Sequence, residues 1–255
     1  MPKILILKTG STYPDIQRTA GDFDRWFCAR LEYKQQVVVA DVTREPPPGT
    51  PSDWQGVLVT GSPSMVTDRE GWSEQTAEWL REAVRLQVPV LGVCYGHQLL
   101  AQALGGRVGF RAQGRESGTF EVALTEAGRQ DPLLGGLSSP FPAHLTHAQS
   151  VLALPPGAVL LANSEGEPHQ AFRVGANIWG VQFHPEFSDA IMTAYLKTQA
   201  PRLAEEGQDP QYLLNAVRET PEAASLIARF EAYAYARDRD APAPEDSAGI
   251  AQGTY

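Results

Sequence analysis

The stretch that decides the fold of this chain is VPVLGVCYGHQ, residues 88–98. Its first six residues are apolar apart from one proline and predict a buried strand, and residues 98–104 (QLLAQAL) predict a helix. A glycine two residues before Cys94 and another two residues after it permit a tight turn between strand and helix. Such a turn is typical of a nucleophile elbow, which holds a reactive side chain above the edge of a sheet.

Cys94 stands at the centre of this turn. A thiol at a helix N-terminus lies near backbone N–H groups and the positive end of the helix dipole, and both favour the reactive thiolate. A buried cysteine in an ordinary glycine-rich turn has the same local sequence, so this motif alone leaves both interpretations open. Cys28 lies beside the apolar face of a predicted helix, and we interpret it as a packed thiol.

Short β-branched runs alternate with helical patterns in the first half of the chain, which is typical of βαβ units and a largely parallel sheet. The predicted strands are 3–8, 36–41, 56–60 and 88–93, and the predicted helices are 14–31 and 73–87. From residue 105 onward, short runs at 120–125, 144–148, 159–162, 170–174 and 178–183 predict antiparallel strands. Helices are predicted at 189–199 and at 211–236, the latter split by Pro221.

Composition and charge limit the function classes. With 42% hydrophobic and 20% charged residues, the chain is neither disordered nor fibrous. A net charge of −9 argues against nucleic acid as a partner. No apolar run approaches the roughly 20 residues that a membrane-spanning helix needs, and the N-terminus lacks the apolar core of a secretory signal. We therefore expect a cytoplasmic protein without a membrane partner, in which the two cysteines stay reduced.

The chain has no internal repeat and no strong linker near its middle, which favours a single domain. We predict that this domain spans residues 1–236. Residues 237–255 are rich in Ala, Pro, Asp and Gly and show no apolar periodicity, so we predict that they form a flexible C-terminal tail.

A second motif, GVQFHPE at residues 180–186, follows an apolar run. A cysteine nucleophile needs a base, and the base usually needs a third group that orients it. His184 and Glu186 supply both residue types, although an isolated H-P-E also fits a surface histidine beside an exposed glutamate. Because this motif and the elbow both lie at predicted carboxyl ends of strands, where open α/β sheets bind ligands, we interpret them as one site.

In this order and separation, the segments 92–98 (GVCYGHQ) and 180–187 (GVQFHPEF) resemble the nucleophile and His-x-Glu motifs of the class I (triad) glutamine amidotransferases. The resemblance extends from Lys3 to about Leu196 and is strongest for free-standing members related to the glutaminase part of GMP synthetase. It implies an α/β fold: a flavodoxin-like, three-layer domain with a mainly parallel central sheet and additional antiparallel strands. The implied reaction is hydrolysis of the glutamine side-chain amide through a γ-glutamyl thioester.

Roles for individual residues follow from the resemblance. It implies that Cys94 is the nucleophile, that His184 is the base and then the acid for the leaving ammonia, and that Glu186 orients His184. The backbone donors of the oxyanion hole would then come from Tyr95 and from the turn 60–63 (TGSP), at Gly61 and Ser62.

The glutamine pocket of the family is lined by a segment His-Gly-Asp-x-Val, which residues 147–151 (HAQSV) match in part. Alanine replaces the glycine of this segment, and glutamine replaces its aspartate. The substrate-binding residues implied by the resemblance are Gln98, Ala148, Gln149 and Ser150.

We expect no cofactor and no metal. The chain has no phosphate-loop motif for ATP, and His144 and His169 do not have the spacing of zinc ligands.

The resemblance implies that glutamine is the substrate and that the ammonia acceptor, if one exists, is a separate synthetase subunit. Two alternatives stay open: the triad could cleave a γ-glutamyl peptide or conjugate instead, or the chain could be a catalytically silent regulatory subunit. The acceptor and the oligomeric state are not visible in the sequence.

Overall fold

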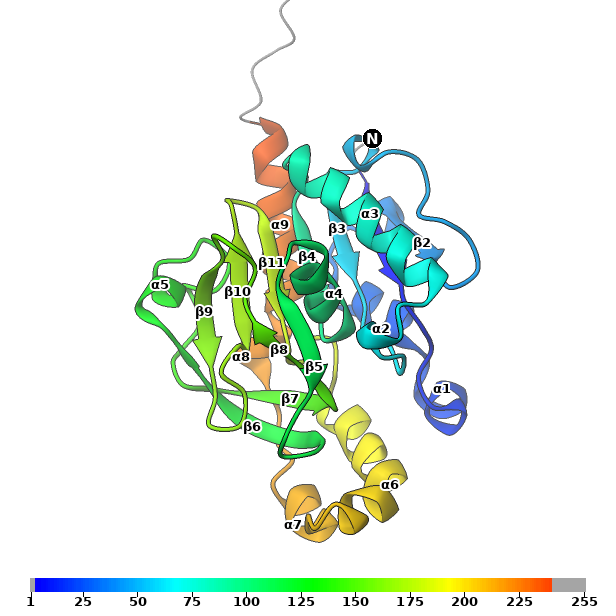
Figure 1. Cartoon of the computed structure of the whole chain (residues 1–255), viewed down its shortest axis with the longest axis vertical. Helices are drawn as coiled ribbons and strands as arrows, with labels where there is room; N and C mark the ends of the chain where they lie inside the picture. Colours follow the sequence, from blue (N-terminus) through cyan, green and yellow to red (C-terminus); the bar gives the residue numbers. More distant parts are fainter. Residues whose placement is uncertain (1–2, 240–255) are drawn as a thin grey trace, which may run out of the picture.

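The computed structural model describes residues 3–239, which form a mixed β-sheet covered by helices (Figure 1). The strands of the main sheet are β1 (Ile4–Lys8), β2 (Val37–Asp41), β3 (Gly56–Val59), β4 (Val90–Val93), β6 (Glu116–Leu124), β7 (Phe141–His147), β9 (Val159–Asn163), β10 (Ala171–Val174) and β11 (Ile178–Val181). Their spatial order is β2-β1-β3-β4-β11-β10-β9-β6-β7. Two further strands, β5 (Arg107–Phe110) and β8 (Gln149–Ala153), pair with each other as a small antiparallel sheet.

The half of the main sheet from β2 to β11 is parallel, and the strands beyond β11 are antiparallel. Helices α3 (Gly71–Arg85) and α4 (Tyr95–Ala103) cover one face of the parallel half, where Leu5 and Leu7 of β1 are buried. Helices α2 (Phe23–Arg30) and α9 (Leu226–Arg239) cover the other face, against Ile4 and Ile6. Both faces are covered, and accordingly residues 4–7 of β1 (ILIL) are all apolar and buried. This arrangement confirms the predicted flavodoxin-like three-layer α/β class.

The remaining helices are α1 (Pro14–Ala20), α5 (Glu126–Arg129), α6 (Asp189–Glu205), α7 (Pro210–Asn215) and α8 (Pro221–Ala224). Figure 1 shows α6 and α7 below the sheet, away from the helices that cover its two faces. They share a separate apolar cluster with α1 and α2, to which Trp26, Phe187 and Leu203 contribute. Among the described residues, no helix is both long enough and apolar enough to cross a membrane.

The prediction of one continuous helix over residues 14–31 is wrong, because the chain breaks between α1 and α2. Gly21 has a φ of 88°, which ends α1. Asp22 then caps α2 by accepting a hydrogen bond from the N–H of Phe23, and it also accepts one from Lys8 at 2.8 Å. The apolar spacing continues through this break, so the pattern alone did not reveal it.

The C-terminal region also differs from its prediction. The sequence predicts one helix over 211–236 with a single break at Pro221, whereas the structure has three helices, α7, α8 and α9. Helix α9 runs to Arg239, three residues past the predicted domain boundary, and its Phe230 and Ala234 are fully buried. Residues 240–255 of the predicted tail lie outside the described residues, so the division at 236 stays a prediction.

The turn between β4 and α4 depends on two glycines. A Cβ atom on Gly92 would lie 2.5 Å from the carbonyl carbon and oxygen of Gly96. A Cβ atom on Gly96 would lie 2.6 Å from the carbonyl oxygen of Val59, on the neighbouring strand β3. Both obstacles are backbone atoms, which cannot rotate away, so only glycine lets the helix approach the sheet this closely.

We expect Gly92→Ala to lower the stability by about 2–3 kcal/mol, because the added methyl group overpacks against backbone. For a chain of this size, the loss corresponds to a fall of roughly 5 °C or more in melting temperature, measured by circular dichroism. Gly71→Ala is the matched control, since a Cβ atom at position 71 meets no heavy atom within 4 Å. Equal melting temperatures for the two variants would contradict the steric argument.

Candidate active site

Cys94 occupies the tip of the turn between β4 and α4. Its φ of 51° and ψ of −97° are unusual for a residue with a side chain, and such strain is concentrated at functional sites. The backbone holds it from both sides: its N–H donates to the carbonyl of Val181 at 2.9 Å, and its own carbonyl accepts from the N–H of Gln98 at 3.1 Å. The thiol is only 6% exposed.

His184 and Glu186 form a buried pair just beyond β11. Nδ1 of His184 donates to Oε1 of Glu186 at 2.7 Å, and the two side chains are 2% and 0% exposed. The imidazole stacks on the ring of Phe187, with centroids 4.2 Å apart. Among the described residues, Nε2 of His184 has no hydrogen-bond partner. Since Glu186 accepts from Nδ1, Nε2 is the nitrogen that remains for Cys94 or for a ligand.

The electrostatic setting favours the charged form of His184. Burial by itself lowers the pKa of this imidazole, but the charge of Glu186, the charge of Cys94 and the hydrogen bond to Glu186 outweigh it, so the pKa is raised well above its ordinary value. An imidazolium beside a sulfur anion is the state that a thiol nucleophile needs.

Two other histidines, His97 and His144, are unsuited to accept a proton from Cys94. Burial lowers the pKa of His97 to about 3, and His97 packs against Phe172 beneath the sheet edge. Burial, followed by the charge of His184, lowers the pKa of His144 to about 4. With pKa values this low, neither ring would hold a proton at neutral pH.

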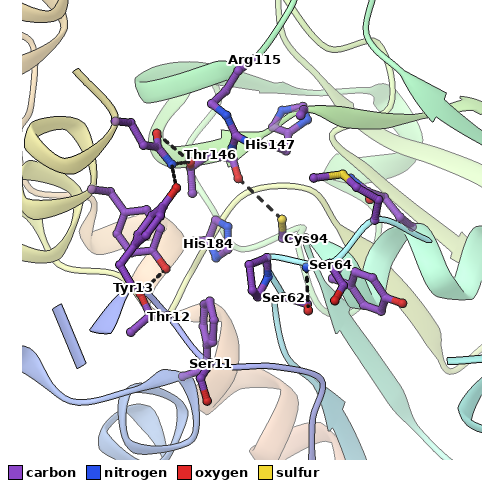
Figure 2. Close-up of a pocket in the computed structure, with 18 of the residues that line it drawn as sticks. Ser11, Thr12, Tyr13, Ser62, Ser64, Cys94, Arg115, Thr146, His147 and His184 are labelled. Atoms are coloured by element: carbon purple, nitrogen blue, oxygen red, sulfur yellow. Dashed lines mark hydrogen bonds between the residues drawn. The ribbon is translucent and has the colours of Figure 1, made fainter. Parts of the chain in front are cut away.

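Cys94 and His184 open into one cavity of about 340 Å³, shown in Figure 2, where the two side chains lie next to each other. This volume lies within the range of small-molecule sites. The wall comes from the loops after β1 and β3, from the start of α4, from the end of β7 and from α6. Its residues are Ser11, Thr12, Tyr13, Pro14, Phe23, Ser62, Pro63, Ser64, Met65, Cys94, Tyr95, Gln98, Arg115, Thr146, His147, Ala148, His184, Tyr195, Gln199 and Arg202.

The three predicted oxyanion-hole residues lie around the same point. Ser62 and Tyr95 line the cavity, and a Cβ atom on Gly61 would lie 2.9 Å from Cε1 of His184. In the described part of the chain, the backbone N–H groups of Gly61, Ser62 and Tyr95 have no recorded acceptor. Tyr95 is the first residue of α4, where an N–H group has no partner within the helix. Their role in binding an oxyanion stays a prediction.

The four predicted substrate contacts are placed differently from one another. Gln98 and Ala148 line the cavity, but Gln149 and Ser150 are not among its lining residues. The side chain of Gln149 donates to Thr67, and the hydroxyl of Ser150 donates to the buried Glu167. Substrate contacts from Gln149 and Ser150 would thus need their side chains to turn, whereas those from Gln98 and Ala148 would not.

Behind Ala148 lies a buried ionic cluster. Nε2 of His147 bonds to Glu116 at 2.9 Å and its Nδ1 to the carbonyl oxygen of Gln149 at 2.8 Å. Arg111 contacts both Glu116 and Glu167, at 3.4 and 3.2 Å. With both ring nitrogens of His147 engaged, this ring fixes the cavity wall and is not free to exchange protons with a ligand. Across the described residues, no group of three or more His, Cys, Asp or Glu side chains is arranged to hold a metal ion.

Much of the wall was missed at the level of sequence. Residues 11–14 follow the predicted first strand, so the rule that ligands bind at carboxyl ends of parallel strands could have indicated them. Tyr195, Gln199 and Arg202 lie four and three residues apart on α6, a spacing that places them on one helix face. No sequence signal indicated that this face meets the cavity, or that Arg115 reaches it.

Comparison with known proteins places this arrangement in a family. The sequence profile of the family described as "Glutamine amidotransferase class-I" matches residues 28–200, which is more than half of the chain. The chain belongs to the class I glutamine amidotransferases. The matched segment contains Cys94, His184 and Glu186.

Relatives of this amidotransferase include glutamine-hydrolysing GMP synthases. It is 40% identical to the one from Aeropyrum pernix over 131 residues, which cover 51% of this chain but only 24% of the relative. It is 33% identical over 158 residues to a separate subunit of the glutamine-hydrolysing GMP synthase from Halobacterium salinarum, covering 62% of this chain and 80% of that protein. The match thus spans about a quarter of the length of the first of these relatives.

Solved structures show the same fold over nearly the whole chain. A glutamine amidotransferase from Methylobacillus flagellatus superimposes with a TM-score of 0.68 at 23% identity, covering 98% of this chain and 99% of that one. One from Thermotoga maritima gives a TM-score of 0.69 at 19% identity, with 92% and 99% covered. These likenesses therefore extend over α6, which lies at the end of the profile match.

The two cysteines should differ in reactivity. At pH 6.5, we expect iodoacetamide to alkylate Cys94 at least about tenfold faster than Cys28, because His184 stabilises the sulfur anion of Cys94 whereas burial, and then Asp24, raises the pKa of Cys28. Mass spectrometry of tryptic peptides measures both rates. Cys28→Ala should leave the fast phase intact, and His184→Ala should remove it. A fast phase that survives His184→Ala would contradict the ion-pair argument.

Proposed function

We propose that this chain hydrolyses the side-chain amide of glutamine through a thioester on Cys94. The observation that carries the proposal is a cysteine held at φ 51° beside a buried His184–Glu186 pair, in a ligand-sized cavity. Nothing in packing requires these three residues together, because a strained cysteine and two buried polar groups each cost stability. Their cost to stability is explained if the three form a catalytic triad.

In the first step, the thiol proton moves to Nε2 of His184 and the sulfur attacks the γ-carbonyl carbon of glutamine. Glu186 keeps Nδ1 protonated and stabilises the imidazolium charge. The carbonyl oxygen becomes an oxyanion, which the N–H groups of Tyr95 and of Gly61 or Ser62 would bind. Because Tyr95 begins α4, the helix dipole favours negative charge at the same point.

In the second step, the tetrahedral intermediate collapses and the carbon–nitrogen bond breaks. The imidazolium of His184 gives its proton to the nitrogen, which leaves as ammonia, and a γ-glutamyl thioester remains on Cys94. Water then attacks the thioester with His184 again as base, and glutamate is released. The raised pKa of His184 supports its role as the proton donor.

A separate synthetase is the proposed acceptor of the ammonia. The Halobacterium relative is named as one subunit of a GMP synthase, which supports a partner chain of that kind.

We place this function in the cytoplasm, where a reducing environment keeps a nucleophilic thiol from oxidation.

Substitutions of the proposed triad test the function. With glutamine as substrate and glutamate and ammonia as readouts, we expect Cys94→Ala to abolish turnover and His184→Ala to lower kcat at least about 1,000-fold. Glu186→Gln should cost less, about 10- to 100-fold, because a neutral amide oxygen still orients the ring but stabilises the imidazolium poorly. Cys28→Ala is the matched control and should keep the full rate.

Other outcomes of these experiments would contradict the triad. Full turnover by Cys94→Ala, or wild-type rates in both His184→Ala and Glu186→Gln with the fold intact, would contradict the triad. A wild-type protein that neither hydrolyses glutamine nor reacts at Cys94 with a glutamine-like chloroketone would instead favour the silent regulatory role. Peptide mapping of the adduct distinguishes Cys94 from Cys28.

A further inference from the structure

The charge of the cavity is opposite to that of the protein. The chain carries a net charge of −9, yet its described cavity wall contains two arginines, Arg115 and Arg202, and no aspartate or glutamate. A cavity of this kind favours a substrate with an additional negative group.

Arg115 is the cavity-lining cation whose side chain makes no hydrogen bond within the described residues. Within residues 3–239, its guanidinium makes no recorded hydrogen bond or ion pair, and its Nε is buried without a partner. Its backbone is nevertheless fixed, because its N–H donates to Glu206 at 3.0 Å and its carbonyl accepts from Gln208 at 2.7 Å. Arg202, by contrast, pairs with Glu206 at 2.9 Å and is 60% exposed. The guanidinium that lacks a hydrogen-bond partner in the described cavity wall is therefore that of Arg115.

The backbone contacts of Arg115 identify the side of the cavity on which it lies. Glu206 and Gln208 come directly after α6, so Arg115 borders the part of the cavity that α6 walls. Gln98 and Met65 line the cavity from α4 and from the loop after β3. In Figure 2, Arg115 and Thr146 lie on one side of Cys94, and Ser62 and Ser64 lie on the other.

Several other polar side chains of the wall near α6 already form hydrogen bonds within the protein. Gln199 donates to the hydroxyls of Tyr13 and Thr146, at 3.2 and 3.0 Å, and accepts from Ser117 at 2.7 Å. The hydroxyls of Thr12 and Tyr195 are 2.6 Å apart and bond to each other. These groups use their hydrogen bonds within the protein, so they shape the space, whereas the guanidinium of Arg115 keeps all of its donors for a ligand.

Given the triad chemistry proposed above, on which this inference rests, we propose that the preferred substrate is a γ-glutamyl amide of an amino acid, and that Arg115 binds the carboxylate of the leaving amino acid. In the reaction, the leaving nitrogen must lie at Nε2 of His184, and the carbonyl oxygen must lie towards Tyr95 and Ser62. The γ-glutamyl group then occupies the side of Gln98 and Met65. The substituent on the nitrogen occupies the side walled by α6, within reach of Arg115.

The reaction balances with water as the only co-reactant. The sulfur of Cys94 forms a bond to the γ-carbon, the carbon–nitrogen bond breaks, and His184 protonates the leaving amine. Water cleaves the thioester, so that glutamate and a free amino acid are the products. Glutamine is then a truncated substrate whose leaving group, ammonia, has no carboxylate to contact Arg115.

Two substrates that differ only at the end of the leaving group test the contribution of the carboxylate. γ-Glutamylglycine carries a carboxylate where γ-glutamyl ethylamide carries a methyl group, and both leave a primary amine. We expect the wild-type kcat/KM to be at least about tenfold higher for γ-glutamylglycine, measured by glutamate release, since a charged hydrogen-bonded pair in a partly buried site contributes at least this factor. Arg115→Gln should bring this ratio close to one, and Arg85→Gln, on the exposed face of α3, should leave it unchanged.

Arg115→Gln is expected to fold, because its guanidinium makes no recorded hydrogen bond in the described structure. Equal losses by this variant on γ-glutamylglycine, γ-glutamyl ethylamide and glutamine would overturn the inference, since Arg115 would then bind the γ-glutamyl part that all three share. A wild-type ratio near one, with glutamine still hydrolysed, would also overturn it and leave the proposed function standing. Failure to cleave any of the three compounds would count against the proposed function itself.

Discussion

The close packing of α4 against β4 is the constraint on which the rest of the site depends. It requires Gly92 and Gly96, and it forces Cys94 into a backbone conformation that residues with side chains rarely adopt. Strand β11 pairs in parallel with β4, with Gly180 opposite Gly92, so the chain leaves both strands at the same edge of the sheet. The N–H of Cys94 bonds to Val181, the last residue of β11 before the segment that carries His184 and Glu186. One strand pairing therefore sets the position of all three side chains.

The sequence predicted the parts of the structure that depend on local patterns. Apolar runs identified β1, β3, β4 and β11, because strands buried on both faces have no polar alternation to obscure them. The motifs around Cys94 and His184 could be placed at the ends of β4 and β11 for the same reason. Their pairing followed from a general rule about ligand sites in α/β sheets, together with the family resemblance, and not from any feature of the two segments alone.

Features that depend on tertiary contacts could not be predicted in this way. The break between α1 and α2 is stabilised by Lys8 and Thr12, which lie outside the two helices that Asp22 separates and bond to its carboxylate. The strands β5 and β8 are short, and they pair only with each other among the described strands. No sequence pattern indicates a role for Arg115, and its relation to the cavity depends on Glu206, about ninety residues later in the chain.

Helices α6 and α7 pack with α1 and α2 in an apolar cluster separate from the core of the main sheet, whereas the proposed triad stands at the edge of that sheet. In the proposed reaction, the residues at the sheet edge determine which bond is broken. The segment around α6 determines which amines can leave. On this proposal, exchanges on the side of α6 that faces the cavity would change which amines can leave, while the turn at Cys94 keeps its own contacts with β3 and β11. Tyr195 of α6 packs on Phe187, which stacks on His184, so only exchanges that keep this aromatic contact would leave the base in place.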